Sequence, residues 1–168
     1  MTVAEQPALV FIGAPGAGKT RIGKRVARLI DLPFVDTDKR IVAKHGAITG
    51  IFENHGEPWF RAREREEVAQ ALTEHAVVAL GGGAVLNEQT QTELAPLRVV
   101  QLTVQPEAIA NRNLSNRPLL ASGVEAWVKL VAERAPTYDR LADVSFDTTS
   151  TPAERVADDI VRWLKENS

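Results

Sequence analysis

The stretch Gly13-Ala14-Pro15-Gly16-Ala17-Gly18-Lys19-Thr20 decides the fold, because it fills every fixed position of the phosphate-binding loop pattern G-x-x-x-x-G-K-[ST]. Glycines let backbone N–H groups turn toward phosphates, the lysine reaches the β and γ oxygens, and the threonine hydroxyl ligates Mg²⁺. An apolar run at residues 8–12 precedes the loop, and residues 21–30 carry apolar side chains at helical spacing. The loop is therefore expected between a buried strand and a helix whose dipole favours a bound anion. The sequence predicts a site for a nucleoside triphosphate.

Apolar, strand-like runs alternate with helical patterns along the chain, which is typical of a parallel sheet covered by helices. We expect strands at residues 8–12, 32–35, 76–80, 98–103 and 143–147, and helices at residues 21–30, 39–44, 58–70, 107–114 and from about 152 onward. The result would be a three-layer α/β sandwich with a five-stranded parallel sheet. Right-handed crossovers bring the carboxyl ends of the strands to one edge, where ligands bind in open parallel sheets.

Composition bounds the class of protein. With 168 residues and neither a repeat nor a linker, the chain is expected to form one domain, residues 1–168, in which both substrates share one fold. The net charge is −2 and basic residues are dispersed among acidic ones, so no nucleic-acid partner is expected. The chain has no cysteine, and its three histidines lack ligand spacing, which argues against disulfides and a histidine metal site.

The sequence also predicts where the protein works. No apolar run approaches the roughly 18 residues that a membrane span requires, and residues 1–7 lack the pattern of a signal peptide. We therefore expect a cytoplasmic protein with no membrane partner. A charged surface and a compact domain favour a monomer.

The segment Asp36-Thr37-Asp38 follows the second expected strand. Residues two apart in an extended segment point the same way, so both carboxylates can face one cavity. One can hold Mg²⁺ through a water molecule, while the other orients an acceptor hydroxyl and takes its proton, as phosphoryl transfer to an alcohol requires. The alternative is a simple helix N-cap. Beside a phosphate loop we favour the catalytic interpretation.

Arginines supply the cationic groups of the expected site, because a planar guanidinium suits carboxylate and phosphate recognition. The candidates are Arg61, Arg63, Arg65, Arg112, Arg117, Arg134 and Arg140. Arg61 has an alternative explanation, since Glu57 and Glu64 lie at i−4 and i+3 and can form ordinary surface ion pairs with it. Arg117 lies in a loop, Arg117-Pro118-Leu119-Leu120, between two helical segments. This loop predicts a mobile lid that carries one charge onto the transferring phosphoryl group.

The triplet Gly81-Gly82-Gly83 follows the third expected strand. It is either a flexible turn or a place where a ligand meets bare backbone, and we favour the second interpretation. Three tryptophans, Trp59, Trp127 and Trp163, are assigned to packing or surface support.

Taken in order, these motifs resemble the shikimate kinase family. The resemblance covers essentially the whole chain and rests on Gly13–Thr20, Asp36-Thr37-Asp38, Gly56-Glu57-x-x-Phe60-Arg61, Leu80-Gly81-Gly82-Gly83, Arg117-Pro118-Leu119-Leu120 and Glu133-Arg134-x-Pro136-x-Tyr138. It implies a P-loop fold like that of nucleoside monophosphate kinases, with an acceptor-binding region at about 38–70 and a lid at about 113–124. It also implies transfer of the γ-phosphoryl group of ATP to the 3-hydroxyl of shikimate, with Mg²⁺ as cofactor, on the route to chorismate and the aromatic amino acids.

The same resemblance implies roles for individual residues. ATP would be bound by Gly16, Ala17, Gly18, Lys19, Thr20, Arg21, Arg112, Arg117 and Pro152. Thr20, and Asp36 through water, would hold Mg²⁺. Shikimate would be bound by Asp38, Phe52, Phe60, Arg61, Gly81, Gly82, Gly83 and Arg134, with Glu64 orienting Arg61. Asp38 would be the base, and Lys19 and Arg117 would complete the catalytic set.

Some residues depart from the family pattern. Arg21 stands where many members carry a second hydroxyl residue, and the segments 45–52 and 112–117 are shorter than usual. Two alternative functions stay open. One is another small-molecule kinase of the same superfamily, such as a gluconate kinase or a nucleoside monophosphate kinase, and the other is a nucleotide-binding module without catalysis. A screen of acceptors separates them.

Overall fold

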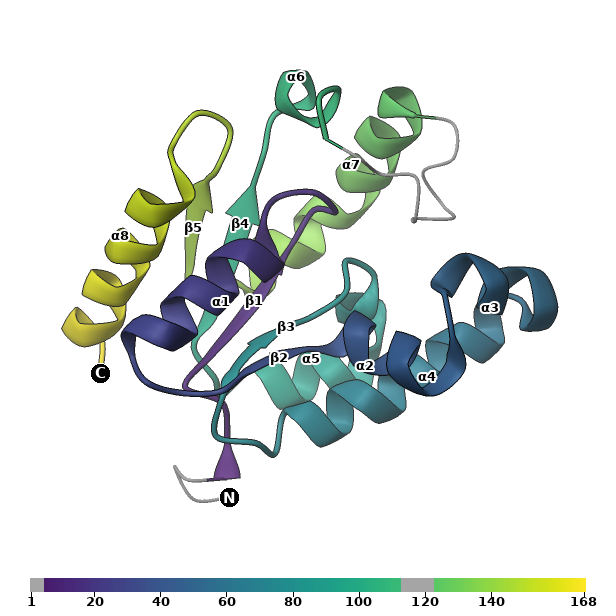
Figure 1. Cartoon of the computed structure of the whole chain (residues 1–168), viewed down its shortest axis with the longest axis horizontal. Coiled ribbons are helices and arrows are strands. Elements are labelled where there is room, and N and C mark those ends of the chain that lie inside the picture. Colours follow the sequence, from purple (N-terminus) through teal and green to yellow (C-terminus); the bar gives the residue numbers. More distant parts are fainter. Residues whose placement is uncertain (1–4, 113–122) are drawn as a thin grey trace.

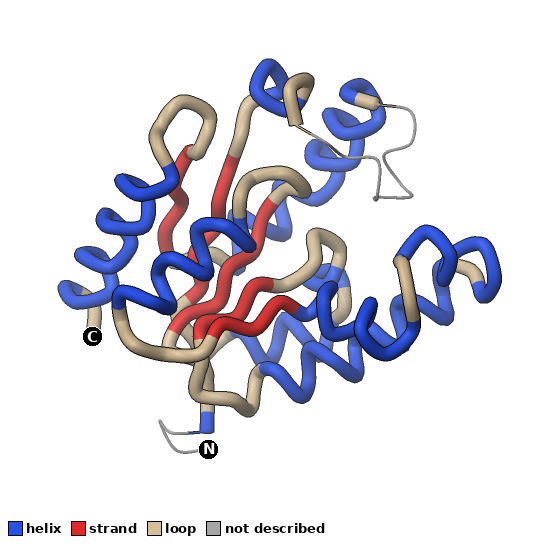
Figure 2. Tube along the Cα trace, in the orientation of Figure 1, coloured by secondary structure: helices blue, strands red, loops and turns tan. Residues whose placement is uncertain are grey.

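The computed structural model describes residues 5–112 and 123–168, and within them five parallel strands form one sheet (Figures 1 and 2). The strands are β1 (Leu9–Gly13), β2 (Phe34–Asp36), β3 (Val77–Ala79), β4 (Val99–Thr103) and β5 (Val144–Asp147). Their spatial order is β2-β3-β1-β4-β5, and every neighbouring pair is parallel. All five strands lie within two residues of the ranges that the sequence predicts, so the α/β fold class is confirmed.

Helices connect the strands and cover both faces of the sheet. They are α1 (Lys19–Leu29), α2 (Thr37–His45), α3 (Ile48–His55), α4 (Glu57–Ala71), the 3₁₀ turn η2 (Ala84–Leu86), α5 (Glu88–Leu94), α6 (Pro106–Ile109), α7 (Val124–Leu141) and α8 (Ala153–Glu166). The region 38–70 is made by α2, α3 and α4, which extend to one side of the sheet (Figure 1). Among the described residues, every helix is too short or too polar to cross a membrane.

The core has two layers because side chains alternate across each strand. On β1, Leu9 and Phe11 pack into one apolar cluster with α1 and α8, while Val10 and Ile12 pack into a second cluster on the opposite face. That second cluster includes Val68 of α4. A strand that is buried on both faces appears in the sequence as a continuous apolar run, which explains why β1 could be predicted without any polar alternation.

Two expectations about helices need correction or completion. The helix expected at 107–114 ends at Ile109, where a turn carries the backbone N–H of Arg112 back to the Ile109 carbonyl at 3.0 Å. Residues 113–114 lie outside the described part of the chain. The helices α3, α5 and α7 are not among the expected helical ranges. The short stretches of α3 and α5 lack the long periodicity that identifies a helix in sequence, and for α7 the sequence predicts only a helical segment of unstated bounds after the Arg117 loop.

The topology brings three loops together at the carboxyl ends of the strands. The phosphate loop follows β1, Asp36 ends β2, and the glycine triplet 81–83 follows β3. These three strands are neighbours in the sheet, so the motifs that the sequence separates by tens of residues lie at one edge.

Candidate active site

The phosphate loop connects β1 to α1 through glycines in backbone conformations that other residues rarely adopt. Gly13 has φ 137°, and a Cβ there would collide with the backbone carbonyl of Leu102 on β4. Gly16 and Gly18 also have positive φ, at 84° and 100°. Lys19 opens α1, and its Nζ donates to the carbonyls of Gly13 at 2.6 Å and Ala14 at 3.2 Å. The ammonium group is therefore held against the loop, where an incoming phosphate would meet it.

Side chains from later elements hold the outer carbonyls of the same loop. Trp127 Nε1 donates to the Pro15 carbonyl at 2.8 Å, and Thr148 Oγ1 donates to the Ala17 carbonyl at 2.7 Å. Both donors are buried. The sequence assigned Trp127 to packing and did not single out Thr148. Each of these donors lies more than 100 residues along the chain from the carbonyl that it contacts, so no local pattern indicates the contact.

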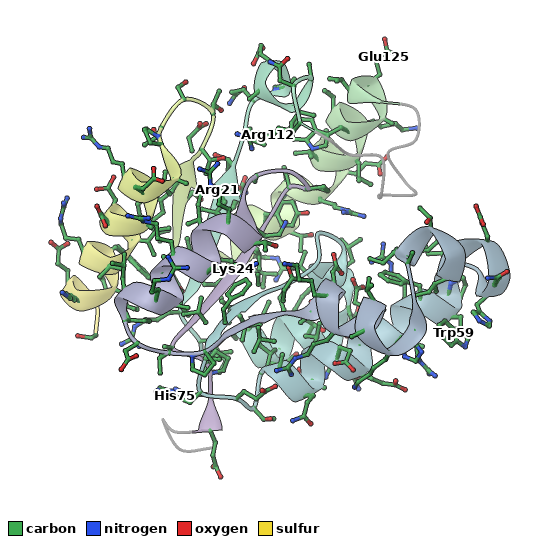
Figure 3. The ribbon with its side chains drawn as sticks, viewed as in Figure 1. Arg21, Lys24, Trp59, His75, Arg112 and Glu125 are labelled. Atoms are coloured by element: carbon green, nitrogen blue, oxygen red, sulfur yellow. The ribbon has the colours of Figure 1, made fainter. Side chains whose placement is uncertain are left out.

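A cavity of about 550 Å³ lies beside the loop and brings together three of the residues predicted to bind nucleotide, Arg21, Arg112 and Pro152. Arg112 donates to the Gly16 carbonyl and, at 3.3 Å, to the Thr148 carbonyl. Figure 3 shows Arg21 and Arg112 at the same end of the molecule, on α1 and just after α6. Gly16, Ala17 and Gly18 also line this cavity, so it is continuous with the phosphate loop.

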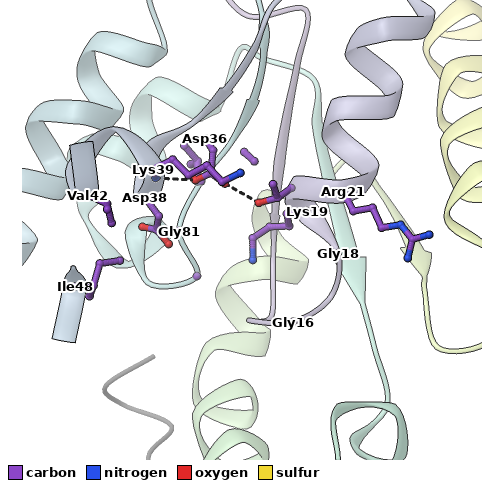
Figure 4. Close-up of a pocket in the computed structure, with 14 residues that line it drawn as sticks. Gly16, Gly18, Lys19, Arg21, Asp36, Asp38, Lys39, Val42, Ile48 and Gly81 are labelled. Carbon is purple, nitrogen blue, oxygen red and sulfur yellow. Dashed lines mark hydrogen bonds between the residues drawn. The ribbon is translucent and has the colours of Figure 1, made fainter. Parts of the chain in front are cut away.

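Thr20 and Asp36 form the pair predicted to hold Mg²⁺. Thr20 Oγ1 donates to Asp36 Oδ2 at 2.6 Å, while Asp36 Oδ1 accepts the backbone N–H of Lys39 at 3.2 Å (Figure 4). Asp36 thus caps α2, which confirms the helix-cap interpretation of this residue, while its role at Mg²⁺ stays a prediction. A hydroxyl and a carboxylate are the hard oxygen ligands that Mg²⁺ prefers, and Mg²⁺ takes its remaining ligands from phosphates and water. Residues 5–112 and 123–168 contain no group of three or more His, Cys, Asp or Glu side chains that could hold a metal ion.

The glycine triplet faces a different charged side chain at each position. A Cβ on Gly81 would lie 2.5 Å from Asp38 Oδ1, one on Gly82 would lie 3.1 Å from Arg134 Nη1, and one on Gly83 would lie 2.5 Å from Arg61 Nη1. Figure 4 shows Asp38 beside Gly81, across a cavity of about 370 Å³ from Lys19. The absence of three side chains therefore lets one carboxylate and two guanidinium groups converge on bare backbone.

Arg61 forms ion pairs with one exposed carboxylate, Glu57, and one buried carboxylate, Glu64. Its Nη1 donates to Glu64 Oε1 at 2.8 Å, and its Nε donates to Glu57 Oε2 at 3.3 Å. Burial opposes the charge on Arg61, but the two carboxylates outweigh it and raise the arginine pKa. Glu64 itself is buried, and burial raises its pKa although Arg61 counteracts the effect. The ion pairs that explained Arg61 as a surface residue instead hold it in place beside Gly83.

Arg134 on α7 is buried, and its Nε has no hydrogen-bond partner among the described residues. One helical turn later, the Tyr138 hydroxyl donates to the Gly82 carbonyl at 2.7 Å, and burial raises the tyrosine pKa. A buried cation with an unpaired donor costs free energy that an anionic ligand would recover. Arg134 is therefore suited to bind an anion, as the sequence predicts.

Two aromatic residues predicted to line the acceptor site lie together on α3 and α4. The rings of Phe52 and Phe60 have centroids 5.2 Å apart, and Phe60 packs with Ile41 and Ile51 in a small apolar cluster. Arg117 and most of the expected lid, residues 113–124, lie outside the described residues.

The fold and the phosphate loop define the class of protein: a P-loop kinase. The family model described as shikimate kinase matches residues 15–165. The chain belongs to the shikimate kinase family and is an ATP-dependent kinase, which excludes the binding-module alternative.

Relatives and solved structures agree with this assignment. The chain is 44% identical to the shikimate kinase of Thermobifida fusca, over 96% of this chain and 97% of that protein, and 38% identical to that of Rhodococcus jostii, over 95% and 99%. The solved structure of shikimate kinase from Acinetobacter baumannii in complex with shikimate matches with a TM-score of 0.90 and 31% identity, covering 98% of this chain and 95% of that one. A gluconokinase from Sinorhizobium meliloti matches with a TM-score of only 0.58 and 16% identity, over 99% and 95% of the chains, which shows a shared fold.

Proposed function

We propose that this enzyme transfers the γ-phosphoryl group of ATP to the 3-hydroxyl of shikimate, giving shikimate 3-phosphate and ADP. The glycine triplet supports the proposal best, because Asp38, Arg134 and Arg61 each approach one of its residues. Shikimate is a small polyhydroxylated carboxylate. Two guanidinium groups, one carboxylate and a backbone without side chains are the groups needed to recognise it.

The donor side uses the phosphate loop. Backbone N–H groups of residues 16–20 and the Lys19 ammonium would bind the phosphates, and the cavity at Arg21, Arg112 and Pro152 would receive the adenine. Thr20 would ligate Mg²⁺ directly and Asp36 through a water molecule. The metal ion, when bound, would neutralise charge on the β- and γ-phosphate oxygens.

The acceptor side would use the side chains of α2, α4 and α7 that approach the glycine triplet. Arg61 and Arg134 would bind the shikimate carboxylate, the backbone of Gly81–Gly83 would meet its hydroxyl groups, and Phe52 and Phe60 would form a wall beside the ring. Asp38 would accept the proton of the 3-hydroxyl as the oxygen attacks the γ-phosphorus and the bond to the β–γ bridging oxygen breaks. ADP would leave with the electron pair of that bond. Arg117 keeps its predicted role at the phosphates.

The proposal also covers the location, the domain organisation and the oligomeric state of the enzyme. We place the reaction in the cytoplasm, as a step toward chorismate and the aromatic amino acids, and expect residues 1–168 to act as one domain and as a monomer without a nucleic-acid or membrane partner. Light scattering of the purified protein with and without MgATP tests the monomer.

A coupled assay of ADP release tests the reaction with MgATP and five acceptors at equal concentration: shikimate, quinate, gluconate, AMP and CMP. We expect turnover with shikimate. Asp38→Asn should nearly abolish that turnover while MgADP still binds, because the amide cannot accept the hydroxyl proton. Asp158→Asn, an exposed position on α8, is the matched control. Turnover confined to another acceptor would refute the substrate, and a near-normal kcat in Asp38→Asn would refute the base.

A further inference from the structure

Trp127 is the first large buried side chain of α7, and it is tied to the phosphate loop. Its side chain is 2% exposed and packs in the same apolar cluster as Ile22 and Val26 of α1. Its indole N–H donates to the carbonyl of Pro15, in the middle of the loop, at 2.8 Å. A buried indole N–H needs a partner, and this one is satisfied by a backbone group of the nucleotide site.

That hydrogen bond fixes the orientation of a peptide plane. The peptide bond between Pro15 and Gly16 is planar and trans, so the Pro15 carbonyl and the Gly16 N–H point in opposite directions. Gly16 has φ 84° and no Cβ, so little in its own backbone prevents this plane from rotating. A donor that holds the carbonyl from outside therefore directs the N–H to the inside of the loop, and Gly16 lines the cavity there.

The next two carbonyls of the loop are held in the same way. Arg112 donates to the Gly16 carbonyl and Thr148 to the Ala17 carbonyl. Three consecutive carbonyls thus accept hydrogen bonds from side chains that lie on three separate segments. Of the three donors, only Trp127 lies on α7, the helix that also carries Arg134.

We infer that Trp127 is a positioning residue for the phosphates of the nucleotide: its indole N–H holds the Pro15–Gly16 peptide plane so that the Gly16 N–H is presented to the bound phosphate. The inference rests on the proposed function for the identity of the nucleotide, but it is independent of the acceptor. An N–H that is oriented before binding does not lose rotational freedom when the phosphate arrives, and the affinity for the nucleotide is higher for that reason.

Trp127→Phe tests this role, because phenylalanine keeps an aromatic ring in the core and removes the N–H. Calorimetry with MgADP, well below the melting temperature, should show a Kd raised about tenfold, and the KM for ATP should rise in parallel. The KM for shikimate should stay within twofold of the wild-type value. Trp163→Phe is the matched control, since Trp163 on α8 packs against the same apolar cluster and should lower the melting temperature without changing the Kd.

A second measurement keeps the test valid if Trp127→Phe does not fold. In the double variant Trp59→Phe, Trp163→Phe, Trp127 is the sole tryptophan, and its fluorescence should change on titration with MgADP with a midpoint equal to the calorimetric Kd. An unchanged Kd in Trp127→Phe, or a fluorescence that does not respond to MgADP, would overturn the inference. Because MgADP is used alone, tight binding without phosphorylation of shikimate would refute the proposed function and leave the role of Trp127 standing.

Discussion

Replacing Gly81 by alanine should damage catalysis while sparing the fold. The added Cβ would lie 2.5 Å from Asp38 Oδ1, whereas ordinary contacts begin at 3.4 Å, so the carboxylate must move by the difference, about 0.9 Å. Gly81 has no positive φ, and alanine can therefore adopt its backbone conformation. The atoms that must give way are the end of one side chain. The substitution should therefore displace the Asp38 carboxylate and leave the surrounding backbone in place.

The size of the effect follows from that displacement. A misplacement of about 1 Å between reacting groups can cost about 100-fold in rate. We therefore expect kcat of Gly81→Ala to fall about 100-fold, which corresponds to about 2.7 kcal/mol of activation free energy. The affinity for MgADP should change less than twofold, because the phosphate loop is not touched.

Steady-state ADP release, calorimetry with MgADP and thermal unfolding measure the three quantities. Gly50→Ala is the control: it lies in α3 of the acceptor region, a Cβ there meets nothing within 4 Å, and alanine favours a helix. That variant should keep its kcat and gain about 0.5–1 kcal/mol of stability. If Gly81→Ala keeps kcat within threefold of the wild-type value, Asp38 is not held where the reaction needs it, and its proposed role as base is wrong.

Three further variants test the proposed binding of the shikimate carboxylate by Arg134, the buried carboxyl of Glu64 and the proposed Mg²⁺ ligand Asp36. Arg134→Ala should raise the KM for shikimate about 10- to 100-fold without changing MgADP affinity, since a charged hydrogen bond contributes about 1.5–3 kcal/mol; an unchanged KM contradicts the carboxylate clamp. Burial raises the pKa of Glu64 in the folded protein above the unfolded-state pKa of about 4.3. The wild type should therefore lose stability as the pH rises from the unfolded-state pKa through the raised folded-state pKa, where the buried carboxyl ionises. Glu64→Gln should lack this loss; the urea midpoints of the two proteins from pH 4 to 8 would differ by a constant amount if the carboxyl did not titrate there. Asp36→Asn should raise the Mg²⁺ concentration needed for half-maximal rate while leaving the melting temperature unchanged, because asparagine caps a helix as well as aspartate does; an unchanged requirement excludes Asp36 from the metal site.

The parts of this molecule that the sequence predicts well are those whose physical cause is local. The central strands β1 and β3 are short apolar runs, and the phosphate loop is a continuous set of residues whose chemistry is fixed by type and spacing. Asp36 shows the limit of such reasoning. The sequence offered metal binding and helix capping as alternatives, and the structure gives one carboxylate oxygen to Thr20 and the other to the backbone of Lys39.

What the sequence could not predict depends on contacts between distant residues. Arg61 has the i−4 and i+3 partners of a surface ion pair, and only the fold shows that Glu64 is buried and that Gly83 leaves room for the guanidinium. Thr148 is a polar residue after an edge strand, and nothing local indicates that its hydroxyl reaches the Ala17 carbonyl. Burial and long-range pairing convert ordinary residues into parts of a site, and neither is written in a short window of sequence.

Helix α7 explains why donor and acceptor sites keep a fixed relation. Its buried residues are Trp127, Arg134 and Tyr138, spaced by seven and four positions, which places them on one face of a helix with 3.6 residues per turn. At 1.5 Å per residue they span about 16 Å along the axis. The first contacts the phosphate loop, the second faces Gly82, and the third donates to the Gly82 carbonyl. Because one helix contacts both the phosphate loop and the glycine triplet, a shift of α7 would disturb the donor side and the acceptor side together.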